Sequence, residues 1–471
     1  MHFRNLLWIG TATALACALV GCALNPPPTA GELQKDAMPH TTVPAAWKVG
    51  SGAPAPVPDR WLASFDDPML AALVAEAISY NADLQVAAAR VEQAEGYVKV
   101  AGGSMLPSVG VLGMTGGKSG GSGGLDGVWL NASLELDVWG RLRYGSAAAQ
   151  AQSAAVAADY AYARQSLAAM VAKSWFMAIE AGIQRGIALD ALHSAEELQR
   201  IASDRLRVGN GNEQALAEAR VNVGTYRDNL RQIELARANA LRALELLLGR
   251  YPAAELAVPP HLSPVPAPVP VGVPSQLLER RPDVIAAERR VAAAFDRVGE
   301  ARAAQLPRIS LTAGGSSVSS ELIVLKDTSN PIWSFGANLI APIYQGGALQ
   351  AQVEIRSAEQ KQAVADYARA GQRAFGEVEN ALAAESALRD RESILAATVR
   401  DSARAVELAQ IQYRVGSTDL RAVEQNQLAL YSVRIALLRV QTERLAQRIN
   451  LYLALGGGFD LPPLTGAVAT Q

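Results

Sequence analysis

The sequence predicts a mixed α+β protein made of two similar halves, each with a helix, two strands, a very long helix and a returning helix. Short motifs recur at one offset of 207 residues: Arg207-Val208-Gly209 returns as Arg414-Val415-Gly416, and Leu248-Gly249 returns as Leu455-Gly456. An offset this long indicates a duplicated half rather than a short solenoid repeat. Segments of alternating apolar and polar residues, and long proline-free segments that favour helix, complete the pattern.

The first residues have the composition of a targeting signal. Arg4 is the only charged residue before an apolar stretch that runs from Leu6 to Val20. The stretch ends in Leu19-Val20-Gly21-Cys22, which resembles a bacterial lipoprotein signal; this implies a signal peptide at 1–21 and a lipid on Cys22. Ala23 follows, not the Asp typical of proteins kept at the inner membrane, which favours the outer membrane. An ordinary secretory signal with an incidental cysteine is the alternative.

A segment rich in Pro and Ala at 22–60 is expected to be an extended linker between the lipid and the fold. It contains the run Pro26-Pro27-Pro28. A single acyl chain holds a protein only weakly, so firm anchoring needs a second contact with the membrane.

Each half contains two candidate strands, at about 108–116 and 127–139 in the first half and at about 308–317 and 331–344 in the second. The even positions from 128 to 138 are apolar, and the odd positions after 332 include Trp333, Phe335 and Leu339. An alternation with a period of two gives a strand one apolar face and one polar face.

Such strands fit two environments. A soluble sandwich covers its apolar face with a second sheet, whereas an outer-membrane barrel turns that face to lipid and its polar face to water. Strands of about 9–11 residues span a membrane when they are tilted. Four strands cannot surround a water-filled lumen, because about eight strands already fill their own interior with side chains. A membrane barrel would therefore need several chains, and the alternation alone leaves the sandwich open.

Two segments, about 141–208 and 347–415, lack proline and are rich in helix-forming residues, which predicts two nearly unbroken helices. About 68 residues with a rise of about 1.5 Å each give roughly 100 Å. Positions that step by four and three from Val156 to Ala181, Met170 and Met177 among them, predict a seam like that of a coiled coil. Returning helices are expected at 213–249 and 419–456, and two apolar stripes on the last one predict packing on both of its sides.

Together these features resemble the outer-membrane efflux protein family, the TolC-like ducts, in its NodT-like lipoprotein branch. Besides the Cys22 signal and the paired Arg-Val-Gly turns, the motifs that carry the resemblance are Leu106-Pro107, Asp137-Val138-Trp139-Gly140, Arg280-Arg281-Pro282-Asp283, Leu306-Pro307 and Pro342-Ile343-Tyr344-Gln345-Gly346-Gly347. The resemblance covers 60–460 in the family's order. It is specific for the family and does not name a substrate.

The resemblance implies a homotrimer in which three chains, with four strands each, supply one twelve-stranded outer-membrane β-barrel that continues as an α-helical barrel in the periplasm. It also implies the exit duct of a tripartite efflux system, with a periplasmic adaptor and an inner-membrane resistance-nodulation-division pump as partners. No cofactor is implied besides the lipid on Cys22. On this basis the chain divides into repeats at 61–255 and 275–460, a Pro-rich connector at 256–274 and a C-terminal tail at 461–471.

The resemblance further implies a gate at the periplasmic helix tips and a contact with the adaptor at the turns Arg207-Val208-Gly209 and Arg414-Val415-Gly416. The family usually has an acidic residue nine positions after the second glycine and then an Arg. Here the register is one residue shorter, with Glu424 in the acidic place and Gln427 where the Arg is usual, so Arg421 is the candidate substitute.

Two interpretations of the tip residues stay open. Three copies of Glu424 near one axis would form an anionic ring that attracts cations; alternatively, Glu424 lies on a solvated helix face. Asp419 either belongs to the gate or is the N-cap of the returning helix, since Asp before an apolar-periodic segment is a helix start signal.

Other function classes find little support in the residues. The four His are scattered without metal-ligand spacing, so neither a catalytic nor a metal site is expected. A net charge of −2 shows no bias toward polyanions, so nucleic acid is not an expected partner. Within the duct class, a type I protein-secretion exit and a metal-efflux exit stay open. Outside it, the rival is a non-conducting, lipid-anchored periplasmic coiled-coil adaptor, which explains the signal and the helices but not the four strands.

Overall fold

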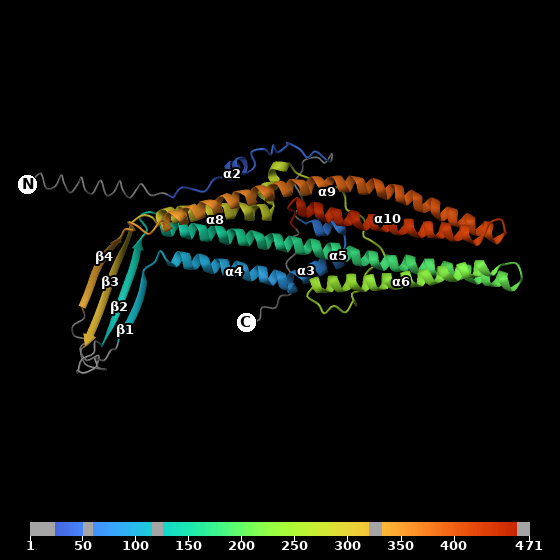
Figure 1. Ribbon diagram of the computed structural model, residues 1–471, viewed down its shortest axis with the longest axis horizontal. Coiled ribbons are helices and arrows are strands. Elements are labelled where there is room, and N and C mark those ends of the chain that lie inside the picture. Colours follow the sequence, from blue (N-terminus) through green and yellow to red (C-terminus); the bar gives the residue numbers. More distant parts are fainter. Residues whose placement is uncertain (1–23, 50–59, 115–125, 320–331, 459–471) are drawn as a thin grey trace, which may run out of the picture. The chain divides into compact units, whose positions relative to one another are not determined.

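The computed structural model describes residues 24–49, 60–114, 126–319 and 332–458 (Figure 1). The predicted signal peptide, Cys22 and the predicted tail at 461–471 lie outside the described residues. The chain divides into two compact units, each of which is described by itself. Unit 1 comprises Met1–Thr42, Ala88–Asp159 and Asp283–Ala370, and unit 2 comprises Val43–Ala87, Tyr160–Pro282 and Gly371–Gln471.

The two halves of the sequence have the same order of elements. The first half contains α3 (Pro68–Tyr80), α4 (Ala82–Gly103), β1 (Ser108–Met114), β2 (Asp126–Leu136), α5 (Arg141–Arg207) and α6 (Glu213–Leu247). The second contains α7 (Leu277–Arg280), α8 (Pro282–Ala303), β3 (Arg308–Ser319), β4 (Ile332–Ile340), α9 (Ala348–Arg414) and α10 (Leu420–Ala454). The four helices after the strands differ from their expected ranges by at most two residues at either end.

Each half begins with two helices, not with the single helix expected, because one polar residue interrupts the helix. Asn81 and Arg281 have extended backbones between the two helices of their half. The Asn81 side chain donates a hydrogen bond of 3.0 Å to the Leu247 carbonyl, at the end of α6. Arg281 donates one of 3.1 Å to the Ala454 carbonyl, at the end of α10. Both side chains are buried, so the break in each half also anchors the C-terminus of its returning helix in unit 2.

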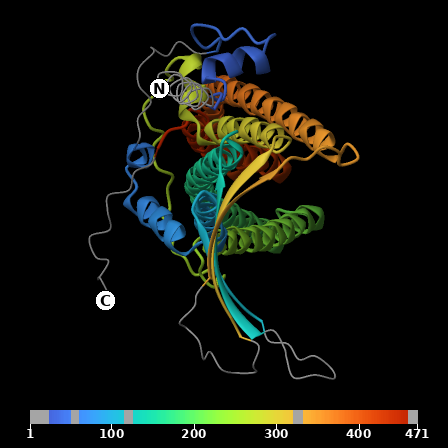
Figure 2. The same cartoon turned by 90° about the vertical axis from the view of Figure 1, so that its left-hand side faces the viewer.

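In unit 1 the strands form one antiparallel sheet in the order β1-β2-β3-β4, as Figures 1 and 2 show. The pairing brings the predicted apolar positions onto one face, for Val111 lies opposite Leu130, Leu134 opposite Leu311 and Ala313 opposite Phe335. Because the side-chain period of a strand is two, this register also collects the polar positions on the other face.

The apolar face of the sheet is exposed on the chain. Val109 of β1 is 68% exposed and Phe335 of β4 is 84% exposed, and Trp333 and Leu339 are exposed on either side of Phe335 along β4. Within the part of the chain that the structure describes, the sheet has four strands and no second sheet lies on it. A soluble sandwich would bury these side chains, so the exposed face favours the membrane barrel over the sandwich.

Two strands are shorter than predicted, and each ends at a turn that leads into a long helix. β2 ends at Leu136, not at Trp139, because the Asp137 carboxylate accepts hydrogen bonds of 2.9 Å from the backbone N–H groups of Leu142 and Arg143, in the first turn of α5. β4 ends at Ile340, before Pro342, which has no N–H to continue a ladder.

The linker expected at 22–60 is not extended throughout. It contains α2 (Ala30–Ala37), which begins with a capping box: Thr29 N–H donates to the Glu32 carboxylate, and Glu32 N–H donates to Thr29 Oγ1. Leu33 is buried on α2, and in unit 2 the buried Trp47 donates from its indole N–H to the Val271 carbonyl at 3.0 Å. The prediction of an extended linker relied on the Pro- and Ala-rich composition. It did not take account of the capping box or of the apolar side chains that pack the segment against the fold.

The predicted seam of α5 is only partly buried within the chain, where Leu167 of the seam is buried. In unit 2 the buried stripe of α5 is formed by Ala168, Val171, Ala172, Trp175 and Ile179, whereas Met170 and Met177 are exposed. The two stripes expected on α10 do both pack, since Leu445 and Ile449 of one stripe and Val440 and Leu451 of the other are buried.

Candidate functional site

The two Arg-Val-Gly turns end their long helices in the same way. Gly209 and Gly416 have φ values of 77° and 80°. The residue after each glycine donates to the carbonyl five positions earlier: Asn210 to Arg205 at 2.8 Å, and Ser417 to Gln412 at 2.9 Å. This is the Schellman pattern, which needs a residue that tolerates positive φ at the glycine position. The glycines of the two motifs therefore have a structural role at the ends of α5 and α9.

The returning helices also begin in the same way. Asn212 Oδ1 accepts a hydrogen bond of 2.7 Å from the Ala215 N–H, and Asp419 Oδ1 accepts one of 2.9 Å from the Ala422 N–H. Each side chain is therefore the N-cap of its helix. The N-cap interpretation of Asp419 is confirmed.

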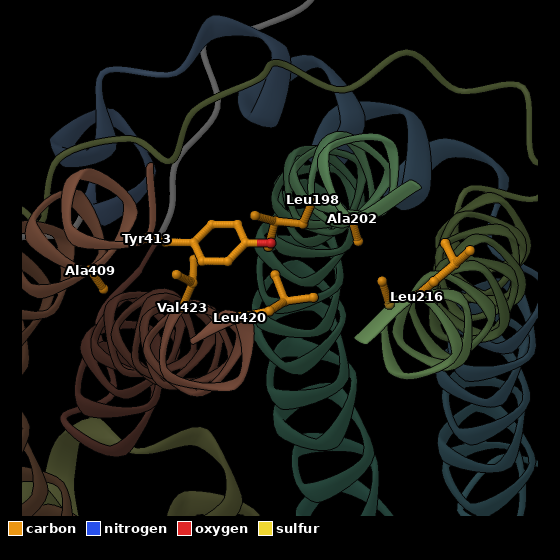
Figure 3. Close-up of a cluster of buried hydrophobic side chains, with 8 residues drawn as sticks. Leu198, Ala202, Leu216, Ala409, Tyr413, Leu420 and Val423 are labelled. Carbon is orange, nitrogen blue, oxygen red and sulfur yellow. The ribbon is translucent and has the colours of Figure 1, made fainter. Parts of the chain in front are cut away.

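An apolar cluster in unit 2 joins the two helical hairpins near their turns (Figure 3). It contains Leu198 and Ala202 of α5, Leu216 and Ala219 of α6, Ala409 and Tyr413 of α9, and Leu420 and Val423 of α10. The Tyr413 ring extends from α9 across the cluster toward Leu198 on α5 (Figure 3). We call this set of residues the tip cluster.

Arg205 of α5 contacts both the backbone carbonyl and the ring of Tyr413. Its guanidinium donates a hydrogen bond of 2.7 Å to the Tyr413 carbonyl, and its central carbon lies 4.1 Å from the centre of the Tyr413 ring. A guanidinium over an aromatic face is attracted by the ring quadrupole. The end of α9 is therefore tied to α5 by a polar contact as well as by the tip cluster.

An ion pair between Glu218, in the second turn of α6, and Arg421, in the first turn of α10, links the two returning helices. Arg421 Nη2 lies 3.0 Å from Glu218 Oε1, which also accepts a hydrogen bond of 3.0 Å from Gln214. The hydrogen bonds from Gln214 and Arg421 hold the pKa of the Glu218 carboxyl below its usual range. Glu218 therefore stays ionised and paired at neutral pH.

Glu424 is half-buried, one turn beyond Arg421 on α10. Burial raises the pKa of its carboxyl, and Glu218 and Asp419 act in the same direction, while a hydrogen bond from Asn222 and the charge of Arg421 oppose the shift. Glu424 is therefore only partly exposed to solvent, in surroundings that disfavour its charged form, and the anionic ring and the solvated helix face both stay predictions.

A cavity of about 500 Å³ lies between α6 and α10, against α5. Three of the predicted tip residues, Arg421, Glu424 and Gln427, line it together. Asp419 is not among the lining residues. The structure thus brings three of the four predicted gate residues to one cavity and gives the fourth a capping role.

Sequence reasoning missed the partners that α6 supplies to this cavity. Tyr226 and Tyr431 lie edge to face, with ring centres 6.0 Å apart and planes at 79°. Asn229 Nδ2 donates a hydrogen bond of 2.7 Å to the Tyr431 hydroxyl. The two tyrosines lie 205 residues apart in the sequence, and no spacing rule predicts that they contact each other. Only the folded structure shows that the two rings pack edge to face and line the cavity together with polar residues.

The sequence matches the family model described as outer membrane efflux protein over residues 73–250 and 273–457. The chain is 33% identical to the cation efflux system protein CusC of Escherichia coli, across 95% of this chain and 98% of that protein. It is 30% identical to the pyoverdine export outer membrane protein OpmQ of Pseudomonas aeruginosa, across 98% of each. Among solved structures, the outer-membrane channel OprN superposes with a TM-score of 0.80 at 26% identity, covering 89% of this chain and 99% of that one.

These matches confirm the predicted fold class, that of the trimeric outer-membrane efflux channels, with four strands in each chain beside long helices. They also confirm the outer membrane as the location, and they favour a channel over the non-conducting adaptor, because the relatives and the structural neighbours are channel proteins. This chain belongs to the outer membrane efflux protein family and is the outer-membrane channel of an efflux system.

Proposed function

We propose that this channel is the exit duct of a tripartite efflux system and that its closed gate is the region where the tips of α5–α6 and α9–α10 meet. The observation that carries the gate is the ion pair between Arg421 and Glu218, which links the returning helices of the two halves. Substrate would pass through passively, with the driving force supplied by an inner-membrane pump of the resistance-nodulation-division class.

Opening this gate requires the two hairpins to separate at their tips. The tip cluster opposes separation because its apolar side chains would return to water. Two polar contacts also oppose it: Arg205 ties the end of α9 to α5, and Arg421 ties the beginning of α10 to Glu218 on α6. A partner that competes for these groups would favour the open form, since a ligand shifts an equilibrium toward the state that it binds better.

The partner we propose at this end is a periplasmic adaptor that contacts the two Arg-Val-Gly turns. Val208 and Val415 are 72% and 73% exposed there, in a part of the chain where other apolar side chains enter the tip cluster. Arg207 and Arg414 precede them in equivalent places, so each turn offers an apolar and a cationic side chain together. Such a combination suits an amphipathic helical partner.

We further propose that Cys22 carries the covalent lipid and that no other cofactor is needed. The Leu19-Val20-Gly21-Cys22 sequence supports this. Mass spectrometry of the mature N-terminal peptide tests it: a diacylglyceryl group on Cys22 is expected, and an unmodified N-terminus upstream or downstream of Cys22 would contradict it.

The relatives of this chain differ in the cargo for which they are named. One relative is named for cation efflux and another for pyoverdine export, so membership in the family is compatible with more than one cargo. An experiment is therefore needed to distinguish export of drugs, export of metals and secretion of a protein. A deletion strain exposed to drugs, dyes, metals and a secreted protein substrate should show sensitivity or retention for one class, and restored expression of the full chain should reverse it.

Single-channel conductance in planar bilayers tests the duct and its gate. The wild-type trimer should be mostly closed, and Glu218→Gln or Arg421→Ala should raise its open probability. The matched control is Arg404→Ala, which removes an exposed pair with Glu407 within α9 and should leave the open probability unchanged. Absence of channel events from every variant would contradict the duct, and equal opening of wild type and both tip variants would contradict the gate.

A further inference from the structure

We propose that the cavity between α6 and α10 is a binding site for a monovalent organic cation with an aromatic or apolar body. Its volume of about 500 Å³ falls within the roughly 300–1,000 Å³ typical of small-molecule sites. The proposal rests on the proposed function only in so far as such a cation would meet the site on its way through the duct. Binding itself is a property of the cavity.

Two tyrosines give the cavity an aromatic wall. Tyr226 and Tyr431 lie edge to face, and the hydrogen bond from Asn229 to the Tyr431 hydroxyl fixes the second ring. Edge-to-face packing uses the edge of one ring and one face of the other, and both residues line the cavity. Aromatic faces attract cations, and the attraction is stronger when the cation is desolvated.

The charged residues of the lining favour a cation. They are Asp228 of α6 and Arg421 and Glu424 of α10. Arg421 donates to Glu218, and Asp228 accepts a hydrogen bond of 2.7 Å from Gln232. Glu424 lies half-buried in the same lining, and the solvation that it loses there is recovered only in part by its hydrogen bond from Asn222 and by the charge of Arg421, which is already paired with Glu218. A bound cation would supply the missing compensation.

Apolar residues set the size and character of the ligand. Ala195 and Leu198 of α5 and Leu428 of α10 line the same cavity. A small hydrated ion gains nothing from these side chains and would lose water beside them, whereas an organic cation buries its apolar body there. The mixture of tyrosine, leucine and carboxylate therefore selects a cation of drug or dye size over an inorganic one, and a cation over a neutral or anionic molecule.

Ethidium, a monovalent aromatic cation with environment-sensitive fluorescence, is the probe. Its binding to the full-length trimer in nanodiscs is measured by fluorescence anisotropy. Glu424→Gln and Tyr431→Leu should each raise the Kd about tenfold, in line with the loss of a charge contact or an aromatic contact in a desolvated site. Tyr431→Phe keeps the ring and should change the Kd about twofold or less.

The control is Glu213→Gln, which removes an exposed acid in the first turn of α6 that does not line the cavity; its Kd should equal that of the wild type. N-phenyl-1-naphthylamine, a neutral probe, should bind wild type and Glu424→Gln alike. The proposal is overturned if Glu424→Gln or Tyr431→Leu binds ethidium as the wild type does, or if Glu213→Gln weakens binding as strongly. If the protein binds ethidium but forms no channels, the proposed duct is contradicted and this site is not. If it forms channels but its ethidium binding does not depend on Glu424, this site is contradicted and the duct is not.

Discussion

Gly249 lies directly against the backbone carbonyl of Tyr80. A Cβ atom at Gly249 would be 2.7 Å from the Tyr80 oxygen, and the glycine has a φ of 75°. In the second half, Gly456 occupies the equivalent place: its Cβ would be 3.2 Å from the Arg280 oxygen, at a φ of 68°. In both halves the end of the returning helix is thus packed on the residue before the break in the first helix, with a contact that excludes a Cβ atom at Gly249 and is tight for one at Gly456.

Gly249→Ala should therefore destabilise the protein more than Gly456→Ala. A left-handed backbone costs a non-glycine residue about 1–2 kcal/mol at either position, and the shorter approach at Gly249 adds a larger steric cost than the one at Gly456. The melting temperature of the purified trimer measures both. Gly186→Ala is the control: Gly186 lies inside α5 with open space around it, so the alanine should stabilise the helix by about 0.5–1 kcal/mol. Equal losses at Gly249 and Gly456 would contradict the role of the contact distance.

The order of the elements was predictable because each depends on local signals. Alternation marks β2 and β4, and the lack of proline together with helix-forming residues marks α5 and α9. The errors arise where a side chain acts on backbone outside its own element. Asp137 looks like part of a strand in sequence, but its carboxylate caps α5, so the strand ends earlier. Asn81 looks like part of a helix, but its hydrogen bond to the end of α6 keeps it extended.

The face of a long alanine-rich helix was not predictable in the same way. Alanine occurs at so many positions of α5 that several seams fit the spacing, and the packing of Trp175 and Ile179 decides between them. The tip residues Glu424 and Gln427 were selected by the positions that they take after the second turn in the pattern of the family that the chain resembles, and Arg421 was selected as the substitute for the missing Arg. Their partner Glu218 is 203 residues away, and no spacing rule connects it to Arg421.

Arg448 carries the best-buried ion pair of α10. Its guanidinium, 2% exposed, contacts the Glu385 carboxylate and the carbonyls of Pro266 and Ala267 in the connector, the Pro266 bond being 2.9 Å long. Arg448→Met should cost about 3–5 kcal/mol, because it leaves a largely buried carboxylate and two carbonyls without a partner. Thermal denaturation of the trimer measures the loss.

The reference change is Arg404→Met, since Arg404 pairs with Glu407 on the exposed surface of α9. Its effect should be about 0–1 kcal/mol. The double variant Arg448→Met with Glu385→Leu should recover much of the stability, because no uncompensated charge is left behind. A single Arg448→Met variant as stable as Arg404→Met would show that the connector is held by other contacts.

Asp296 makes the stability of α8 dependent on pH. It is 5% exposed, and burial raises its pKa from 3.8 to about 6. Since the fold favours the protonated form, its stabilising contribution is complete below about pH 4 and is lost as the pH rises through about 6. Asp296→Asn keeps a neutral side chain of the same shape. The variant should therefore melt at a higher temperature than the wild type at pH 7.5, and the difference should shrink toward pH 4.5.

The comparison for Asp296 is Asp366→Asn, an exposed acid paired with Arg369 one turn away on α9. Its melting temperature should follow that of the wild type from pH 4.5 to 7.5. A constant difference between Asp296→Asn and the wild type across this range would mean that ionisation of Asp296 does not affect the fold.

The caps of the two returning helices allow the structural role of Asp419 to be separated from any role in gating. Asp419→Ala should cost about 0.5–2 kcal/mol at the start of α10, because the Ala422 N–H loses its acceptor, whereas Asp419→Asn keeps the cap but removes the charge. Amide hydrogen exchange in the first turns of α10 should speed up in Asp419→Ala and stay near wild type in Asp419→Asn. Asn212→Ala should produce the same change in the first turns of α6, where the cap is uncharged.

If Asp419→Asn keeps slow exchange yet raises the open probability in planar bilayers, the charge of Asp419 contributes to the closed gate beside Glu218 and Arg421. If it keeps both slow exchange and the wild-type open probability, Asp419 is a cap alone.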